Sequence, residues 1–286
     1  MDVTGAVLAL VLSLLWGANP VAIKLGLIDA PPLRLAVFRF IVGGLVVLLW
    51  AWPTGRLAGF RVERHEWQPL VMVGLLLGAQ VSMLNIGTSL TSASHSAVLL
   101  NLYAVHTVVF AHFMIPGDRL TARKLAGTLI GYSGVVMLLA SRAGSGDATL
   151  AGDSLMLLSG VTLGFRTVYL ARTVQRLDQV KMLLAQAAFG VLVFLAGSLL
   201  FESRATAWTW RLAGAVAYQG VAIAGFNFIV NLWLLKHYRP SALATFFLTQ
   251  PIFGVIAAAL VTGDPLTVEL LFASVAVAIG IGLTSR

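Results

Sequence analysis

The sequence predicts an all-α integral membrane protein of ten transmembrane helices, arranged as two inverted five-helix repeats. The first observation is composition: hydrophobic residues make up 59% of the 286 residues and charged residues only 10%, against about 25% charged in a typical soluble domain. Second, the apolar runs are continuous rather than alternating, which favours helices over a membrane barrel. Third, one arrangement of apolar run and turn occurs twice, about half the chain apart.

Length and turn residues give the helices in order. A bilayer core of about 30 Å requires roughly 20 apolar residues per helix, so the chain has room for about ten spans. Clusters such as Pro31-Pro32, Pro53-Thr54-Gly55 and Gly144-Ser145-Gly146-Asp147 mark the turns between them. The predicted spans are about 3–28, 33–52, 67–90, 93–115, 122–141, 150–171, 180–201, 210–235, 240–262 and 266–285.

The repeated stretch lies near the end of each half. Ser96-Ala97 opens an apolar run that closes at Gly117-Asp118, and Ser241-Ala242 opens one that closes at Gly263-Asp264, 145 to 146 residues further on. Each turn is followed by a Thr that can cap the next helix. The spacing extends backwards, with Gly17 matching Gly164, Arg39 matching Gln186 and Gly43 matching Gly190 at 147, and Asn85 matching Asn231 at 146. We therefore predict repeats at 1–145 and 146–286.

The distribution of Lys and Arg orients the helices. The even connections and the C-terminus hold twelve: Arg56, Arg61, Arg64, Arg119, Arg123, Lys124, Arg172, Arg176, Lys181, Lys236, Arg239 and Arg286. The odd connections hold five: Lys24, Arg34, Arg142, Arg204 and Arg211. By the positive-inside rule both termini are cytoplasmic. Because five spans is an odd number, the second repeat is inverted, which is the build of many secondary transporters with a midplane substrate site.

Several functions are disfavoured by what the sequence lacks. There is no cysteine, which excludes disulfides, Cys-ligated zinc and thiol catalysis. We find no phosphate-binding Gly-rich loop, no His-Glu-x-x-His metal motif and no pair of carboxylates inside a span, so we expect no enzyme, no cofactor and no metal. The net charge is +8, but no run of basic residues in a soluble segment is interleaved with aromatic residues, so nucleic acid is not expected as a partner. A channel is disfavoured because the duplicated chain encloses its own cavity, which also favours a monomer.

The chain resembles a known family in the order of its motifs. The stretch Leu15-Trp16-Gly17-Ala18-Asn19-Pro20-Val21-Ala22-Ile23-Lys24, then Phe38-Arg39-Phe40, and an acid-Leu-Thr turn closing each repeat are similar to the drug/metabolite transporter superfamily, and more closely to its EamA-type branch. The chain is also similar to bacterial exporters of aromatic amino acids. The resemblance implies outward transport of amino acids or other small metabolites across the bacterial cytoplasmic (inner) membrane. Exporters of sugar conjugates or cationic drugs remain the alternative.

This chain departs from the family pattern at two points. The turn acids are Asp118 and Asp264 where Glu is common, and His106 stands where the second repeat has Pro251. His106 shares a helical face with His95, Leu99 and Leu102. It is either a hydrogen-bonding group of the cavity wall or a satisfied interior histidine.

Polar and aromatic residues inside the spans are the candidate site. Arg166 is far from the loops and, with Phe165 and Tyr169 near it, is a candidate for binding a carboxylate. The full set of candidate substrate-binding residues is Trp16, Gln80, Tyr103, His106, Phe165, Arg166, Tyr169, Asn227, Phe246 and Gln250. The candidate gating or structural residues are Pro20, which should kink its helix, Arg39, Asn85, Asn231 and Pro251. Every Asp and Glu lies in a loop or near a helix end, which favours facilitated export over proton coupling.

Overall fold

A computed structural model describes residues 2–57, 60–115, 117, 119–140, 149–238, 246–247 and 249–284. Of the features singled out in the sequence, Asp118, the Gly144–Asp147 tract and Ser241-Ala242 lie outside the described residues, as do Arg142, Arg239 and Arg286. The boundary between the two repeats near residue 145 also lies there and stays a prediction.

The described chain is all helical, and its helices follow the ten predicted spans. Seven of the described helical segments are long and apolar enough to cross a membrane. The helices are α1 (Val3–Asp29), α2 (Pro32–Ala51), α3 (Trp67–Ser89), α4 (Ala93–Asn101), α5 (Tyr103–Met114), α6 (Ala122–Ala140), α7 (Leu150–Thr173), α8 (Gln179–Phe201), α9 (Trp210–Ala217), α10 (Phe228–His237), α12 (Gln250–Val261) and α13 (Val268–Thr284), with a 3-10 turn η1 (Arg64–Glu66) and a π-helix η2 (Tyr218–Asn227).

Two spans are more divided than the sequence predicts. The fourth consists of α4 and α5, which meet at Leu102, and the eighth consists of α9, the π-helical η2 and α10. Such π-helical turns are frequent at functional sites. The junction of α4 and α5 lines the cavity described below, and η2 leads directly to Phe228 of the cavity wall. The first span, by contrast, continues as one helix through Pro20.

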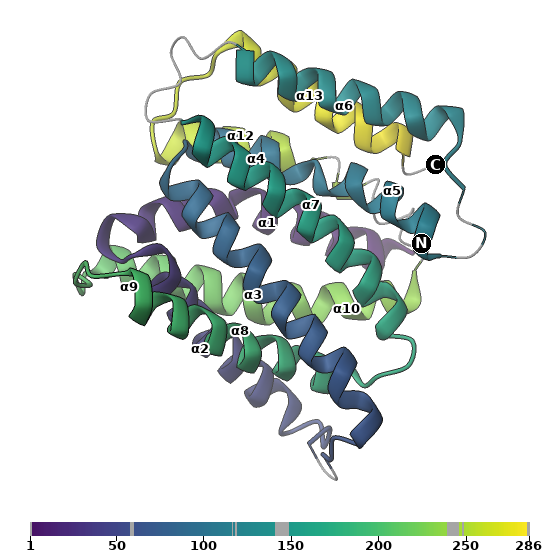
Figure 1. The fold of residues 1–286 in the computed structure, drawn as a ribbon, viewed down its shortest axis with the longest axis vertical. Helices are drawn as coiled ribbons and strands as arrows, with labels where there is room; N and C mark the ends of the chain where they lie inside the picture. The colour runs from purple at the N-terminus through teal and green to yellow at the C-terminus, as the bar shows by residue number, and fades with distance from the viewer. Residues whose placement is uncertain are drawn as a thin grey trace.

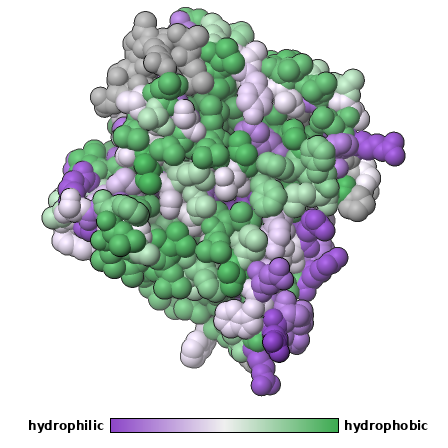
Figure 2. Space-filling view, in the orientation of Figure 1, coloured by the Kyte–Doolittle hydropathy of each residue, from purple (hydrophilic) through white to green (hydrophobic). Residues whose placement is uncertain are grey.

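Most helices run from one end of the bundle to the other (Figure 1), and the N- and C-termini lie at the same end. We call this the terminal end. In the same view, hydrophilic residues gather at the two ends and a hydrophobic surface lies between them (Figure 2). This is the surface that a bilayer requires of a multi-pass membrane protein.

The two halves pack symmetrically with an offset of 147 residues. A Cβ atom on Gly17 would lie 2.7 Å from the Gln250 carbonyl oxygen and 2.9 Å from the Phe253 Cβ atom. A Cβ atom on Gly164 would lie 3.0 Å from the Tyr103 carbonyl oxygen and 2.7 Å from the His106 Cβ atom. Residues 103 and 106 become 250 and 253 when 147 is added. Both crossings are therefore the same contact between the halves, made once in each direction.

This register corrects two matches made from the sequence. His106 corresponds to Phe253 rather than to Pro251, because both pack on equivalent glycines. Likewise, Asn227 corresponds to Gln80 of α3, and Asn231 does not correspond to Asn85. Gln80 donates to the Ser159 hydroxyl and Asn227 donates to the Leu12 carbonyl. Residues 80 and 12 become 227 and 159 when 147 is added. The spacing of the turns includes loops that differ in length, whereas helix packing fixes the register inside the membrane.

The turn chemistry predicted after each repeated run is confirmed. Gly117 and Gly263 have φ angles of +87° and +73°, the left-handed conformation that glycine tolerates best. The hydroxyl of Thr121 accepts a hydrogen bond from the Lys124 amide at 3.3 Å, and that of Thr267 accepts one from the Leu270 amide at 3.2 Å. These threonines therefore cap α6 and α13, which pack against each other at one edge of the bundle (Figure 1).

Candidate functional site

A cavity of about 560 Å³ lies between the two repeats. Its lining residues come from α1 to α8, α10, α12 and α13, so both halves of the chain contribute. It extends from Trp16 and Asn101, near the middle of their spans, toward Lys124 and Leu235 at the terminal end. The cavity therefore approaches only one end of the bundle.

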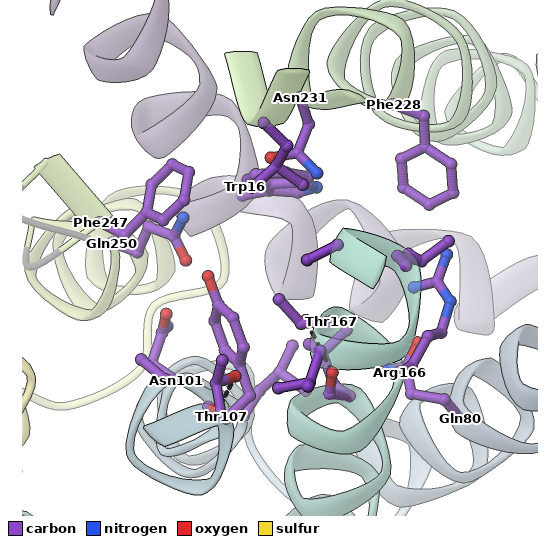
Figure 3. A pocket seen from close by; sticks show the side chains of 18 of the residues that line it. Trp16, Gln80, Asn101, Thr107, Arg166, Thr167, Phe228, Asn231, Phe247 and Gln250 are labelled. Atoms are coloured by element: carbon purple, nitrogen blue, oxygen red, sulfur yellow. Dashed lines mark hydrogen bonds between the residues drawn. The ribbon is translucent and has the colours of Figure 1, made fainter. Parts of the chain in front are cut away.

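One side of the cavity is aromatic. Trp16 of α1 meets Phe247 edge to face, with 5.7 Å between ring centroids. Gln250 lies beside Phe247 (Figure 3), and the Tyr103 side chain, which also lines the cavity, lies near that of Gln250. Tyr103 and Gln250 correspond at the 147-residue offset. They therefore face each other across the internal symmetry axis.

The other side of the cavity is cationic. Arg166 of α7 lies next to Gln80 and faces Phe228 (Figure 3), whose ring centroid is 5.4 Å from the guanidinium carbon. Its Nη2 atom donates a hydrogen bond to the Gln186 Oε1 atom of α8. Arg39 of α2 also lines the cavity. Both arginines are buried, with 5% and 3% of their surfaces exposed.

No Asp or Glu is among the residues that line this cavity in the described part of the chain. Nor do the described residues contain a group of three His, Asp or Glu side chains that could hold a metal ion. The hydrogen-bond partner of Arg166 is the amide of Gln186, and Gln80 adds another amide to the lining, with its Nε2 atom donating to Ser159 Oγ at 3.0 Å. The cavity is thus an apolar and amide-lined space with an excess of positive charge.

Half of the ten predicted substrate-binding residues line this cavity. They are Trp16, Gln80, Tyr103, Arg166 and Gln250. Three residues predicted to be structural or gating line it as well: Pro20, Arg39 and Asn231. Their roles in binding stay predictions, but the structure brings these eight residues from seven helices to one space.

The other predicted residues are not part of this lining. The His106 Nε2 atom pairs with the Tyr132 hydroxyl of α6. Phe165 and Tyr169 stack on each other at 6.5 Å, and Phe165 also meets Phe110 of α5. The roles of these three residues in binding also stay predictions. In this conformation their side chains contact partners outside the cavity lining.

The remaining four predicted residues make contacts between helices. Asn227 bonds to the Leu12 carbonyl, and Asn85 donates to the Pro32 carbonyl at 2.9 Å. Phe246 packs against the cluster of Ala9, Leu12 and Leu234. Pro251 is buried in the first turn of α12. The bond from Asn85 is the interhelical contact that the sequence suggested for this residue.

The sequence did not single out several residues of the lining. They are Asn19, Asn101, Thr107, Gln186, Phe228 and Phe247. Asn19 and Gln186 had a signal, because at an offset of 147 they correspond to Arg166 and Arg39. The others carry no such sign, because a residue's helical face does not show whether the neighbour is a cavity or another helix.

The opposite end of the bundle is closed by contacts between the repeats. Arg211 forms a bidentate ion pair with Asp29, at 2.7 and 2.8 Å. Glu202 accepts a hydrogen bond from the Leu33 amide at 2.6 Å, and Asp264 accepts one from the Ser94 amide at 2.8 Å. Below them, Val21, Ala93 and Ala258 form a buried apolar cluster of α1, α4 and α12, which we call the plug.

Comparisons with known proteins agree with this architecture. The model of the EamA-like transporter family matches residues 3–140 and 150–286. The uncharacterized transporter YvbV of Bacillus subtilis (strain 168) is 27% identical, with 93% of this chain and 86% of that protein covered. The probable amino-acid metabolite efflux pump of Escherichia coli (strain K12) is 26% identical, with 91% and 88% covered.

A solved crystal structure has the same fold. It superposes with a TM-score of 0.72 at 19% identity, covering 99% of this chain and 96% of the other. The family match accounts for nearly all of the chain, in two copies that each hold five helical spans. The resemblance seen in the sequence is therefore confirmed, and the chain belongs to the EamA-like transporter family.

Proposed function

We propose that this protein exports small organic metabolites by alternating access across the bacterial inner membrane, and in first place amino acids with aromatic or apolar side chains. The observation that carries the proposal is the cavity between the repeats, which combines an aromatic wall with two buried guanidinium groups and has no carboxylate among its described lining residues. Its volume of about 560 Å³ lies within the usual range of ligand pockets, about 300–1,000 Å³.

The two sides of the cavity suit the two ends of an aromatic amino acid. The carboxylate lies on the cationic side, where the planar fork of a guanidinium group matches a carboxylate. The aromatic side chain packs near Trp16 and Phe247, and the amide oxygens of Gln80 and Asn231 are acceptors for the ammonium group. Cationic drugs fit less well, because the cavity already holds two arginines and no acid.

The direction of opening supports a loading step on the cytoplasmic side. The cavity approaches the terminal end, whereas the plug and the contacts of Asp29, Glu202 and Asp264 close the opposite end. Because the sequence predicts cytoplasmic termini, this conformation would accept solute from the cytoplasm. Exchange of conformation between inverted repeats would then open the other end.

The energy source that fits these residues is the solute gradient itself. A proton-coupled carrier commonly places a carboxylate in its membrane-embedded path, and none lines this cavity. The relative named as a probable amino-acid metabolite efflux pump supports both the direction and the substrate class. The protein is proposed to work as a monomer, because a single chain encloses the cavity.

Counterflow in proteoliposomes tests the proposal. Vesicles are preloaded with unlabelled phenylalanine, leucine, threonine or a nucleotide sugar, and labelled solute is added outside. We expect saturable counterflow with phenylalanine and leucine. Absence of counterflow with every amino acid, in vesicles where the protein remains folded, would reject the substrate class.

A pair of tryptophan variants links transport to the cavity. Trp16→Ala removes a ring that meets Phe247, and an aromatic pair of this kind contributes about 0.5–1.5 kcal/mol, so we expect roughly two- to tenfold weaker counterflow. Trp52→Ala is the matched control, because Trp52 is 78% exposed at the end of α2. Equal loss in both variants would reject the assignment of Trp16.

A further inference from the structure

Arg39 is a buried cation whose contacts in the protein do not satisfy it. Its side chain is 3% exposed and lines the cavity. Its Nε and Nη1 atoms have no hydrogen-bond partner among the described residues, and its guanidinium carbon lies 5.1 Å from the centre of the Phe40 ring. A buried charge without hydrogen bonds is strongly disfavoured. The partner of Arg39 must therefore enter the cavity from outside or arrive in another conformation.

The internal symmetry identifies the partner within the chain. At the 147-residue offset Asn19 corresponds to Arg166 and Arg39 corresponds to Gln186. Arg166 and Gln186 are hydrogen-bonded to each other. The equivalent bond between Arg39 and Asn19 is not made, and the Asn19 Oδ1 atom is also buried without a partner. One half of the molecule thus has the amide-arginine pair formed, and the other half has it open.

This difference is what alternating access predicts for inverted repeats. When the repeats exchange conformations, a contact present in one half is lost and its counterpart in the other half is gained. The cavity would then close at the terminal end and open at the opposite end, while the pair of Arg166 and Gln186 is lost and the pair of Arg39 and Asn19 forms. The pair of Arg39 and Asn19 belongs to the state that opens away from the terminal end.

We propose that Arg39 binds the carboxylate of the transported solute while the cavity is open at the terminal end, and that Asn19 replaces the solute as its partner in the opposite state. This inference rests on the proposed carrier function and narrows its substrate class. The preferred solutes carry a carboxylate and no net positive charge, because two guanidinium groups and no acid surround them. Aromatic carboxylates should bind at least as well as aromatic amino acids, and the corresponding amines should not bind.

Direct binding to the purified protein in lipid nanodiscs tests the inference by calorimetry. The probes are 3-phenylpropionate, phenylalanine and phenethylamine, which share a ring and differ in charge. We expect the first two to bind and phenethylamine not to bind. Arg39→Gln should weaken phenylpropionate binding roughly 10- to 100-fold, as expected for a charge-assisted hydrogen bond. Arg39→Lys, which keeps the charge but loses the planar fork, should fall in between.

Arg56→Gln is the matched control for the loss of an arginine. Arg56 is exposed and lies 4.8 Å from the Trp50 ring, so this variant should bind as the wild type does. Arg39→Gln that melts as the wild type and binds phenylpropionate equally tightly would overturn the inference. So would tighter binding of phenethylamine than of phenylpropionate.

Two substitutions at Asn19 keep the test decisive if Arg39→Gln does not fold. Asn19→Asp adds a carboxylate to the cavity at nearly constant volume, and it should abolish phenylpropionate binding; undiminished binding would overturn the anion site. Asn19→Ala should bind the anion normally but slow its counterflow, and wild-type counterflow would overturn the exchange of partners. Arg39-dependent binding without any transport would reject the export proposal and leave the anion site standing.

Discussion

The contact between Gly254 and Ala97 closes the bundle directly beside the cavity, and adding one methyl group there should open it. At the end of the bundle opposite the termini, α12 packs on α4. Toward the terminal end, residues of α5 and Phe247 line the cavity instead. A Cβ atom on Gly254 would lie 2.5 Å from the Ala97 Cβ atom and 2.8 Å from the Gly17 carbonyl oxygen. Gly254→Ala therefore forces α12 away from α4.

The size of the effect follows from the overpacking, which costs about 1–3 kcal/mol. This cost falls only on the conformation in which α4 and α12 touch. The gain in helix propensity when Gly becomes Ala is the same in both conformations, because Gly254 is helical in each, so it cancels. The equilibrium should therefore shift toward opening by roughly 5- to 150-fold.

The absence of native cysteine allows the opening to be measured with one introduced thiol. Ala258→Cys places it in the plug, where Ala258 is 0% exposed. A membrane-impermeant maleimide, applied from the side opposite the termini, should react roughly 5- to 150-fold faster when Gly254→Ala is added. Gly214→Ala is the control, because no atom lies within 4 Å of the added Cβ. Equal reaction rates in the two variants would refute the view that this contact holds the end closed.

Two further predictions concern pH and orientation. The amide of Gly5 and the hydroxyl of Tyr238 donate to Asp2 and lower the pKa of its carboxyl below the ordinary value, so their stabilisation is present above about pH 4 and is lost as the pH falls through the lowered pKa. The melting temperature of the wild type should therefore approach that of Asp2→Asn on acidification, and a constant difference would contradict this. The charge distribution predicts that Thr54→Cys reacts with an impermeant maleimide only in permeabilised cells and Ala205→Cys in intact cells; the reverse pattern would show that the termini face outward.

The helices could be predicted from the sequence because their signals are local. Apolar runs of membrane length and Gly-Pro turns fixed the limits of α1, α2 and α3 within two residues of the observed ones. The register between the repeats could not be read in the same way. The turns match at 145 to 146 residues and Gly17 matches Gly164 at 147, and only the packing of these two glycines shows that 147 is the offset inside the membrane.

The cavity could be predicted only in part, for a reason that His106 illustrates. A helical stripe shows which residues share a face, and His106 does share one with Leu99 and Leu102. It does not show what covers that face, and here Tyr132 of α6 pairs with the imidazole. Arg166 does line the cavity, in keeping with the argument that a cation far from both ends of a span must find water or a polar partner; its role in binding stays a prediction. That argument depends on depth in the membrane, which the sequence shows well.

The symmetry of the backbone and the asymmetry of the chemistry together suggest how such a cavity can change sides. Each repeat carries one arginine and one amide at corresponding sites, but their order is reversed: Asn19 and Arg39 in the first, Arg166 and Gln186 in the second. If both arginines stood on equivalent helices, both would be paired or unpaired at similar positions, and no exchange would favour either state. With the order reversed, the pairing of one arginine can accompany the release of the other. The solute carboxylate then stands in for the amide that is absent, so neither guanidinium is left alone in a medium that penalises bare charge.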